Sequence, residues 1–180
     1  VGLRVKSYLD TPSADVLIHL AENPSLADIN ESYLIESGVL LDSLLKKNFG
    51  LVIYASSASV YGDTSLNQWT ETDTPNCVSA YCRGKINNEK KVLASNGLVV
   101  RVTNVIGPGM SQNNVLSDIL KQFPGEGPVI VRDEKPIRDF IWVEDLVDAF
   151  EQLMQSNQSG IFNVGSGKSF SIRQLVQLAT

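Results

Sequence analysis

The sequence has no long apolar run, only one histidine and two cysteines, and fewer basic than acidic residues. Its longest apolar stretches, such as 16–21 and 51–55, are far shorter than the about 20 residues of a membrane-spanning helix. Fifteen lysines and arginines stand against 20 aspartates and glutamates, and this net charge of −5 argues against the basic patch that nucleic-acid binding requires. No apolar leader follows Val1-Gly-Leu-Arg4. We therefore expect no membrane segment and no nucleic-acid partner.

The cysteines and the histidine predict packing rather than chemistry. Cys77 and Cys82 are too far apart for a C-x-x-C redox pair, and no histidine or further cysteine accompanies them as a metal ligand. We therefore predict two free thiols in a reducing cytosol, and no metal site. His19 lies inside the apolar run Leu17-Ile-His-Leu20, and we expect it to pack at a strand end.

Strand-like apolar runs and helical periodicity alternate along the first 102 residues. The pattern predicts strands at 15–20, 51–55 and 98–102, helices at 29–47 and 79–94, and a loop at 62–78. Strands separated by helices form crossover units and a parallel sheet. We predict an α/β fold with a Rossmann-like, doubly wound parallel sheet.

The alternation changes after residue 106. Helices are predicted at 115–123 and 145–155, strands at 129–131 and 161–164, and a capping box, Ser171-Ile-Arg-Gln174, opens a last helix. We assign 1–106 and 137–165 to an incomplete sheet domain. Residues 107–136 and 166–180 then form a small second lobe, which is also only partly present.

Tyr81 and Lys85 carry the strongest chemical signal. At positions i and i+4 they share one face of the predicted helix, although an exposed tyrosine beside a solvated lysine is the commoner reason for such a pair. Ser56 and Ser57 end an apolar strand, and active sites of open parallel sheets lie at such strand ends. The pattern therefore predicts one site with a hydroxyl, a phenol and an ammonium.

With these residues the sequence resembles the extended short-chain dehydrogenase/reductase family, the NAD-dependent epimerases and dehydratases of nucleotide sugars. The resemblance covers roughly residues 15–170 and is specific as an ordered combination of short motifs. The stretches that carry it are Asp15-Val-Leu-Ile-His-Leu-Ala21, Ser56-Ser-Ala-Ser-Val-Tyr-Gly62, Tyr81-Cys-Arg-Gly-Lys85, Arg101-Val-Thr-Asn-Val-Ile-Gly-Pro108, Arg138-Asp-Phe-Ile-Trp-Val-Glu-Asp145 and, more weakly, Asn163-Val-Gly-Ser-Gly167. It implies NAD or NADP as cofactor of the incomplete domain 1–106 and 137–165. It also implies a nucleotide-diphosphate sugar as substrate, with 107–136 and 166–180 as part of a substrate-binding lobe.

The resemblance also implies catalytic roles. Tyr81 would be the acid/base, and Lys85 would hold the nicotinamide ribose and favour the phenolate. Ser57 would hydrogen-bond the reacting hydroxyl, with Ser56 as the alternative for that role.

Binding roles follow from the same resemblance. Asn104 and Arg138 would hold the diphosphate, unless Arg138 forms a salt bridge with a neighbouring aspartate, Asp139 or Asp145. The cofactor would also contact Leu20, Ala21, Ala55 and Ser56. Asp145 is expected to be a helix cap.

The departures from the family pattern are informative. Dehydratases of the family have an acidic pair directly after the Ser/Thr, where this chain has Ala58 and Ser59, so we expect no dehydration. Ile35 replaces an asparagine that lies three residues before a glycine, here Gly38.

The glycine-rich fingerprint of dinucleotide binding is missing. No G-x-x-G-x-x-G occurs, and a strand–turn–helix unit of roughly 30 residues does not fit before Asp15. Because the chain also begins with Val1 instead of methionine, we expect that its amino end is not the natural one.

Two functions remain open. The first is an NAD(P)-dependent nucleotide-sugar epimerase or 4-keto reductase, cytoplasmic and homodimeric, which would pair through the helix of Tyr81 and the preceding helix as relatives do. The second is a non-catalytic protein that binds a nucleotide sugar or a partner and has lost cofactor binding.

Overall fold

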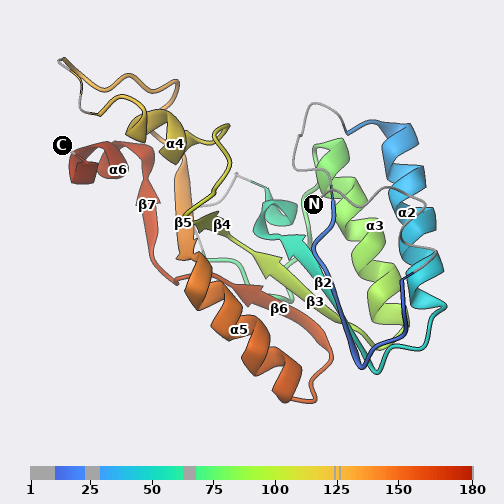
Figure 1. Cartoon of the computed structure of the whole chain (residues 1–180). Coiled ribbons are helices and arrows are strands. Elements are labelled where there is room, and N and C mark those ends of the chain that lie inside the picture. Colours follow the sequence, from blue (N-terminus) through green and yellow to red (C-terminus); the bar gives the residue numbers. More distant parts are fainter. Residues whose placement is uncertain (1–10, 23–28, 63–67, 124, 126, 180) are drawn as a thin grey trace. The chain divides into compact units, whose positions relative to one another are not determined.

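The computed structural model describes residues 11–22, 29–62, 68–123, 125 and 127–179 (Figure 1). The chain divides into two compact units. The first comprises Val1–Val102 with Glu151–Asn163, and the second comprises Thr103–Phe150 with Val164–Thr180.

A parallel sheet forms the centre of the first unit. Its strands are β1 (Val16–His19), β2 (Leu51–Ser57), β3 (Leu98–Val102) and β6 (Gly160–Val164), in the order β1-β2-β3-β6. β2 pairs in parallel with both β1 and β3, with His19 opposite Tyr54 and Ser57 opposite Val102. The prediction of a parallel α/β sheet is confirmed, and His19 is buried at a strand end as expected.

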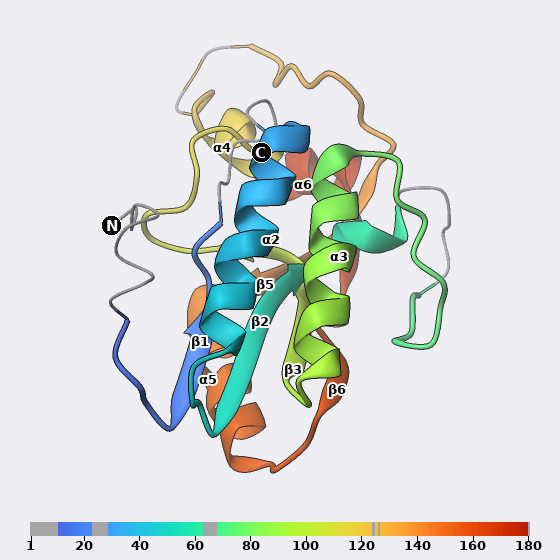
Figure 2. The ribbon, with the colours of Figure 1, turned by 90° about the vertical axis from the view of Figure 1, so that its right-hand side faces the viewer.

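Helices α2 (Glu31–Leu45) and α3 (Ala80–Ala94) lie side by side against this sheet (Figure 2). Each begins at a side-chain cap, because Asn30 accepts a hydrogen bond from Tyr33 N and Ser79 accepts one from Cys82 N. The helices approach closely at Gly84, where a Cβ would lie 2.5 Å from a Leu34 methyl carbon. The core between helices and sheet contains Leu41, Val52, Tyr54, Val92 and Val99.

The second unit has a small mixed sheet that the sequence pattern did not predict. β4 (Asn104–Ile106) pairs in parallel with β5 (Ile137–Trp142), and β7 (Ser169–Ser171) pairs antiparallel with β5. The unit also contains α4 (Val115–Leu120), α6 (Ile172–Ala179) and most of α5 (Val143–Gln155). The strand predicted at 129–131 is wrong, because that segment is irregular. The capping box is confirmed by reciprocal hydrogen bonds between Ser171 and Gln174.

The prediction of two free thiols is wrong, because Cys77 and Cys82 form a disulfide. Their Cα atoms are 5.2 Å apart, within the usual range for a disulfide. The turn capped by Ser79 folds the loop before α3 back onto the first turn of the helix, so the sulfurs meet despite their spacing. The disulfide packs beside Val60 and Tyr61, and the Tyr61 ring stacks on Trp69.

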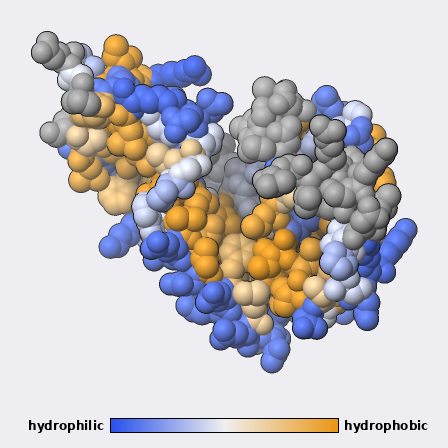
Figure 3. All heavy atoms as spheres, in the orientation of Figure 1, coloured by the Kyte–Doolittle hydropathy of each residue, from blue (hydrophilic) through white to orange (hydrophobic). Residues whose placement is uncertain are grey.

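The surface carries both polar and apolar side chains (Figure 3). Large apolar side chains that are exposed include Leu20 at 66%, Ile35 at 66% and Val39 at 58%. Within the described ranges, none of the helices has the length and apolar character that crossing a membrane would take.

Candidate active site

Tyr81 and Lys85 come together at the start of α3. The Ser79 cap places Tyr81 in the first turn, and one turn later the Lys85 ammonium nitrogen lies 5.6 Å from the centroid of the Tyr81 ring. Lys85 is only 7% exposed, whereas Tyr81 is half-buried. The pair is therefore not an exposed tyrosine beside a solvated lysine.

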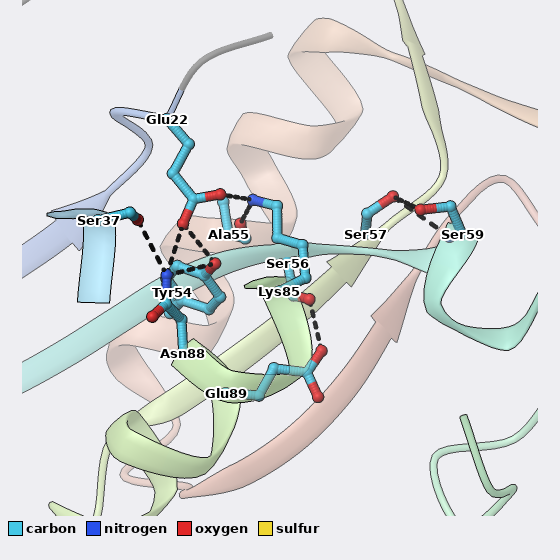
Figure 4. A network of polar contacts seen from close by, with 10 residues as sticks. All are labelled: Glu22, Ser37, Tyr54, Ala55, Ser56, Ser57, Ser59, Lys85, Asn88 and Glu89. Carbon is cyan, nitrogen blue, oxygen red and sulfur yellow. Dashed lines mark hydrogen bonds and ion pairs between the residues drawn. The ribbon is translucent and has the colours of Figure 1, made fainter. Parts of the chain in front are cut away.

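Lys85 Nζ is held by two oxygens. It donates to the carbonyl oxygen of Ala55 at 2.7 Å and lies 2.7 Å from Glu22 Oε2 (Figure 4). The other carboxylate oxygen, Glu22 Oε1, accepts hydrogen bonds from Tyr54 OH at 2.5 Å and from Asn88 Nδ2 at 3.0 Å. Sequence reasoning missed Glu22, Tyr54 and Asn88, since no local spacing links them to the lysine.

The network shifts three pKa values. Burial alone raises the pKa of Glu22, but the charge of Lys85 and the hydrogen bonds outweigh burial, so the pKa is lowered. Burial and the neighbouring Glu22 carboxylate raise the pKa of Tyr54. Burial also lowers the pKa of His19, helped by Lys85 and opposed by Glu22. The site therefore contains an ionised Glu22, a neutral Tyr54 and a neutral His19 at pH 7.

The two serines at the end of β2 have different surroundings. Ser56 is 5% exposed and its hydroxyl donates to the buried carboxylate of Glu89. Ser57 is half-buried, caps the short 3-10 helix Ala58–Tyr61 by accepting from Ser59 N, and lies 2.9 Å from the Ser59 hydroxyl. Because the Ser56 hydroxyl is buried and already donates to Glu89, Ser57 is the better candidate of the two for contact with a ligand.

A buried ion pair supports the end of β2. Arg101 on β3 donates two hydrogen bonds to the Glu89 carboxylate, at 2.7 and 3.1 Å, and both side chains are 3% exposed. Arg101 also donates to Tyr61 OH at 2.8 Å, and Tyr61 OH donates to Asn163 Oδ1 at 2.7 Å. The ion pair, its partners and Ser56 therefore join β2, β3, α3 and β6.

The other predicted cofactor contacts lie at strand ends. Leu20 and Ala21 directly follow β1 and are exposed. Ala55 is half-buried on β2, and its carbonyl oxygen is the acceptor of Lys85.

In the second unit Asn104 and Arg138 line one cavity of about 600 Å³. The cavity is also bordered by Gly107, Pro108, Gly109, Met110, Ser111, Asn114, Phe140 and Val143, among others. Asn104 Nδ2 donates to the Asp139 carbonyl oxygen at 3.0 Å, while the Asp139 carboxylate accepts from Thr103 Oγ1, Ser166 N and Gly167 N. Asp145 is not a helix cap, because α5 begins two residues earlier.

Comparison with known proteins agrees with this architecture. The model of the NAD dependent epimerase/dehydratase family matches residues 3–165. A UDP-glucose 4-epimerase from Halalkalibacterium halodurans is 24% identical over 202 residues, which cover 93% of this chain and 60% of that protein. Other relatives include UDP-glucuronic acid decarboxylases from Arabidopsis thaliana and a GDP-6-deoxy-D-mannose reductase from Pseudomonas aeruginosa.

Solved structures share the fold. MoeE5 in complex with UDP-glucuronic acid and NAD superposes with a TM-score of 0.83 at 26% identity, covering 97% of this chain and 65% of that one. RMD from Pseudomonas aeruginosa complexed with NADPH gives a TM-score of 0.79 at 27% identity, covering 91% and 63%. The chain thus spans less than two thirds of the length of these proteins. The match over most of its residues shows that it belongs to the NAD-dependent epimerase/dehydratase family.

Proposed function

We propose that the protein is an NAD(P)-dependent nucleotide-sugar epimerase or 4-keto reductase in which Tyr81 is the acid/base. The observation that carries this proposal is the buried Lys85 ammonium beside the Tyr81 ring, at the strand end that carries Ser57. Among the described residues this arrangement supplies a phenol, an ammonium and a hydroxyl, which suit the transfer of a proton to or from a sugar hydroxyl.

The residues fit the nicotinamide-ribose end of the cofactor. Two of the three N–H donors of Lys85 are used by Glu22 and Ala55, so a third can reach a ribose hydroxyl. Exposed Leu20 and Ala21 offer apolar contact at the end of β1. When bound, NAD(P) supplies the chemistry of accepting a hydride from the sugar or donating one to it.

Tyr81 and Ser57 divide the proton chemistry. In the oxidising direction the Tyr81 phenolate takes the proton of the sugar hydroxyl, and the Lys85 ammonium stabilises the phenolate. Ser57 orients the hydroxyl through a hydrogen bond. In the reducing direction Tyr81 returns the proton to the oxygen of the keto group. An epimerase performs both steps on one sugar, whereas a reductase performs only the second.

The cavity in the second unit is our candidate site for the diphosphate of the nucleotide sugar. Arg138 provides a guanidinium that can bind two phosphate oxygens, and Asn104 provides an amide in the same cavity. The relatives are named for UDP and GDP sugars, which supports the same ligand class. Because Ala58 and Ser59 provide no carboxylates, dehydration is not part of the proposal.

A product assay tests this function. The protein is incubated with NAD⁺ and, in turn, UDP-glucose, UDP-N-acetylglucosamine and UDP-glucuronic acid, and products are identified by NMR. We expect the C4 epimer of one sugar with NAD⁺. For a reductase we expect loss of the reduced cofactor's absorbance in a separate reaction that contains NADH or NADPH and a 4-keto sugar nucleotide. No turnover of any substrate with either NAD or NADP would contradict the proposal.

The second candidate, a non-catalytic nucleotide-sugar-binding or interaction protein, is favoured by one observation. The 180 residues contain no G-x-x-G-x-x-G to bind a pyrophosphate. A fluorescence titration with NADH separates the candidates, because the enzyme requires cofactor binding and this alternative does not. A folded protein that binds UDP-sugars but shows no binding of NADH or NADPH at cofactor concentrations up to about 1 mM would favour the alternative. A Kd above about 1 mM corresponds to weak binding.

We also propose a homodimer formed through α2 and α3. Ile35 and Val39 lie one turn apart on α2 and expose 66% and 58% of their surface, which gives this helix an apolar outer stripe. A cytoplasmic location remains a prediction.

A further inference from the structure

The Glu22–Lys85 ion pair is the feature of the site that the proposed chemistry does not use. The nitrogen–oxygen distance is 2.7 Å, and the two side chains are only 13% and 8% exposed. The ammonium that would hold a ribose is therefore already bound to a carboxylate of the same chain (Figure 4). The cavity that both residues line, with Tyr81, Gly84 and Asn88, is about 10 Å³, which is no more than the volume of one water.

Glu22 is held in place independently of the lysine. Tyr54 OH and Asn88 Nδ2 both donate to its Oε1 atom, from β2 and α3. Asn88 also donates to Ser37 on α2 at 3.3 Å, so the carboxylate is fixed by three elements of the fold. Such a preorganised anion keeps its position beside Lys85 without a ligand.

We propose that Glu22 is a positioning residue that acts through Lys85, holding the ammonium in place and lowering the affinity of the site for a nicotinamide dinucleotide. The dinucleotide is an anion, and Lys85 attracts it less while its charge is neutralised by Glu22. The inference rests on the proposed function, which assigns the cofactor ribose to Lys85. Glu22 would thereby set how tightly the cofactor is kept.

Glu22→Gln removes the charge and keeps the shape of the side chain. The glutamine carbonyl oxygen can accept from Lys85 and its amide can donate to Tyr54 OH, but the hydrogen bond from Asn88 Nδ2 is lost, because two N–H donors then face each other. We expect the Kd for NADH to fall about tenfold, the effect of one unit charge about 10 Å away at an effective dielectric constant of about 20. Merely structural damage would weaken binding, so tighter binding distinguishes the two roles.

The experiment is an NADH fluorescence titration of four proteins: wild type, Glu22→Gln, Glu36→Gln and the double variant Glu22→Gln/Lys85→Ala. Glu36→Gln removes the same charge from an exposed position on α2, where the carboxylate accepts from Ser32, and should leave the Kd within about twofold. The double variant should lose the tenfold gain, because Glu22 acts through Lys85. Urea unfolding of each variant, measured by circular dichroism, reports that it is folded.

The outcomes separate the inference from the function on which it rests. The inference is supported if Glu22→Gln binds NADH more tightly than the wild type while the other two variants do not. It is also supported if Glu22→Gln binds NADH where the wild type shows no binding. If the wild type binds NADH and Glu22→Gln binds equally or more weakly, the inference is overturned and the proposed function stands. If all four folded proteins fail to bind, both are overturned for this chain, since freeing Lys85 then creates no affinity.

Discussion

The buried Glu89–Arg101 pair gives a prediction whose size can be worked out from the structure. Glu89→Ala removes the carboxylate that pairs with Arg101, whose side chain is 3% exposed, and leaves it the hydrogen bond to Tyr61 OH. It also removes the acceptor of Ser56. Losing one member of a buried ion pair costs about 3–5 kcal/mol. For a protein of this size, a loss of about 4 kcal/mol lowers the melting temperature by about 12 °C. Native stabilities are only about 5–15 kcal/mol, so this loss removes between about a quarter and about four fifths of the free energy of unfolding.

Chemical and thermal unfolding measure this effect, with two matched variants. Glu31→Ala breaks the exposed pair with Arg83, whose side chains are 76% and 48% exposed, and should cost less than about 1 kcal/mol. Glu89→Leu combined with Arg101→Met removes both charges and should recover most of the loss. A Glu89→Ala variant within about 1 kcal/mol of wild type would refute the claim that this pair supports the end of β2.

Three further predictions concern Lys85, Ile35 and His19. Lys85→Ala should weaken NADH binding by about tenfold or more, because the candidate ribose donor is lost, and an unchanged Kd in the titration would remove that role from Lys85. Ile35→Glu should convert a dimer to a monomer in sedimentation velocity by placing a charge in the exposed α2 stripe; an unchanged dimer would place the interface elsewhere. Burial lowers the pKa of His19 below 6.5, so its contribution to stability is present above about pH 6.5 and is lost as the pH falls through the folded value. His19→Gln should flatten the fall of the urea midpoint that begins below about pH 6.5, because no other histidine is present; an unaltered pH dependence would contradict this account.

The sheet and helices of the first unit could be predicted because their signals are local. The apolar run at 51–55 and the cap at Ser79 each lie inside the element they define, and β2 and α3 begin where the pattern places them, within one residue. The sheet of the second unit was missed because its strands are short and pair with distant segments, as Asn104 does with Phe140. Three-residue strands such as β4 provide too few positions for a period to be read.

In the candidate site, too, residues related by local spacing could be predicted and residues brought together only by the fold could not. Tyr81 and Lys85 are predictable because one helix turn relates them. Glu22 is not, because its partners Tyr54, Lys85 and Asn88 come from two other elements and only the fold brings them together. The Cys77–Cys82 disulfide was missed for a related reason, since linear spacing does not show how the capped turn at Ser79 folds back.

The role of Tyr81 as acid/base is the central claim, and Tyr81→Phe tests it most directly. The substitution removes one hydroxyl and keeps the ring beside Lys85. Turnover of the nucleotide sugar is measured together with the Kd for NADH. We predict a loss of kcat of about 10²–10⁴-fold with a Kd within about twofold of wild type, as expected for a lost proton-transfer group. Turnover that is unchanged at an unchanged Kd would contradict the account and place the acid/base elsewhere.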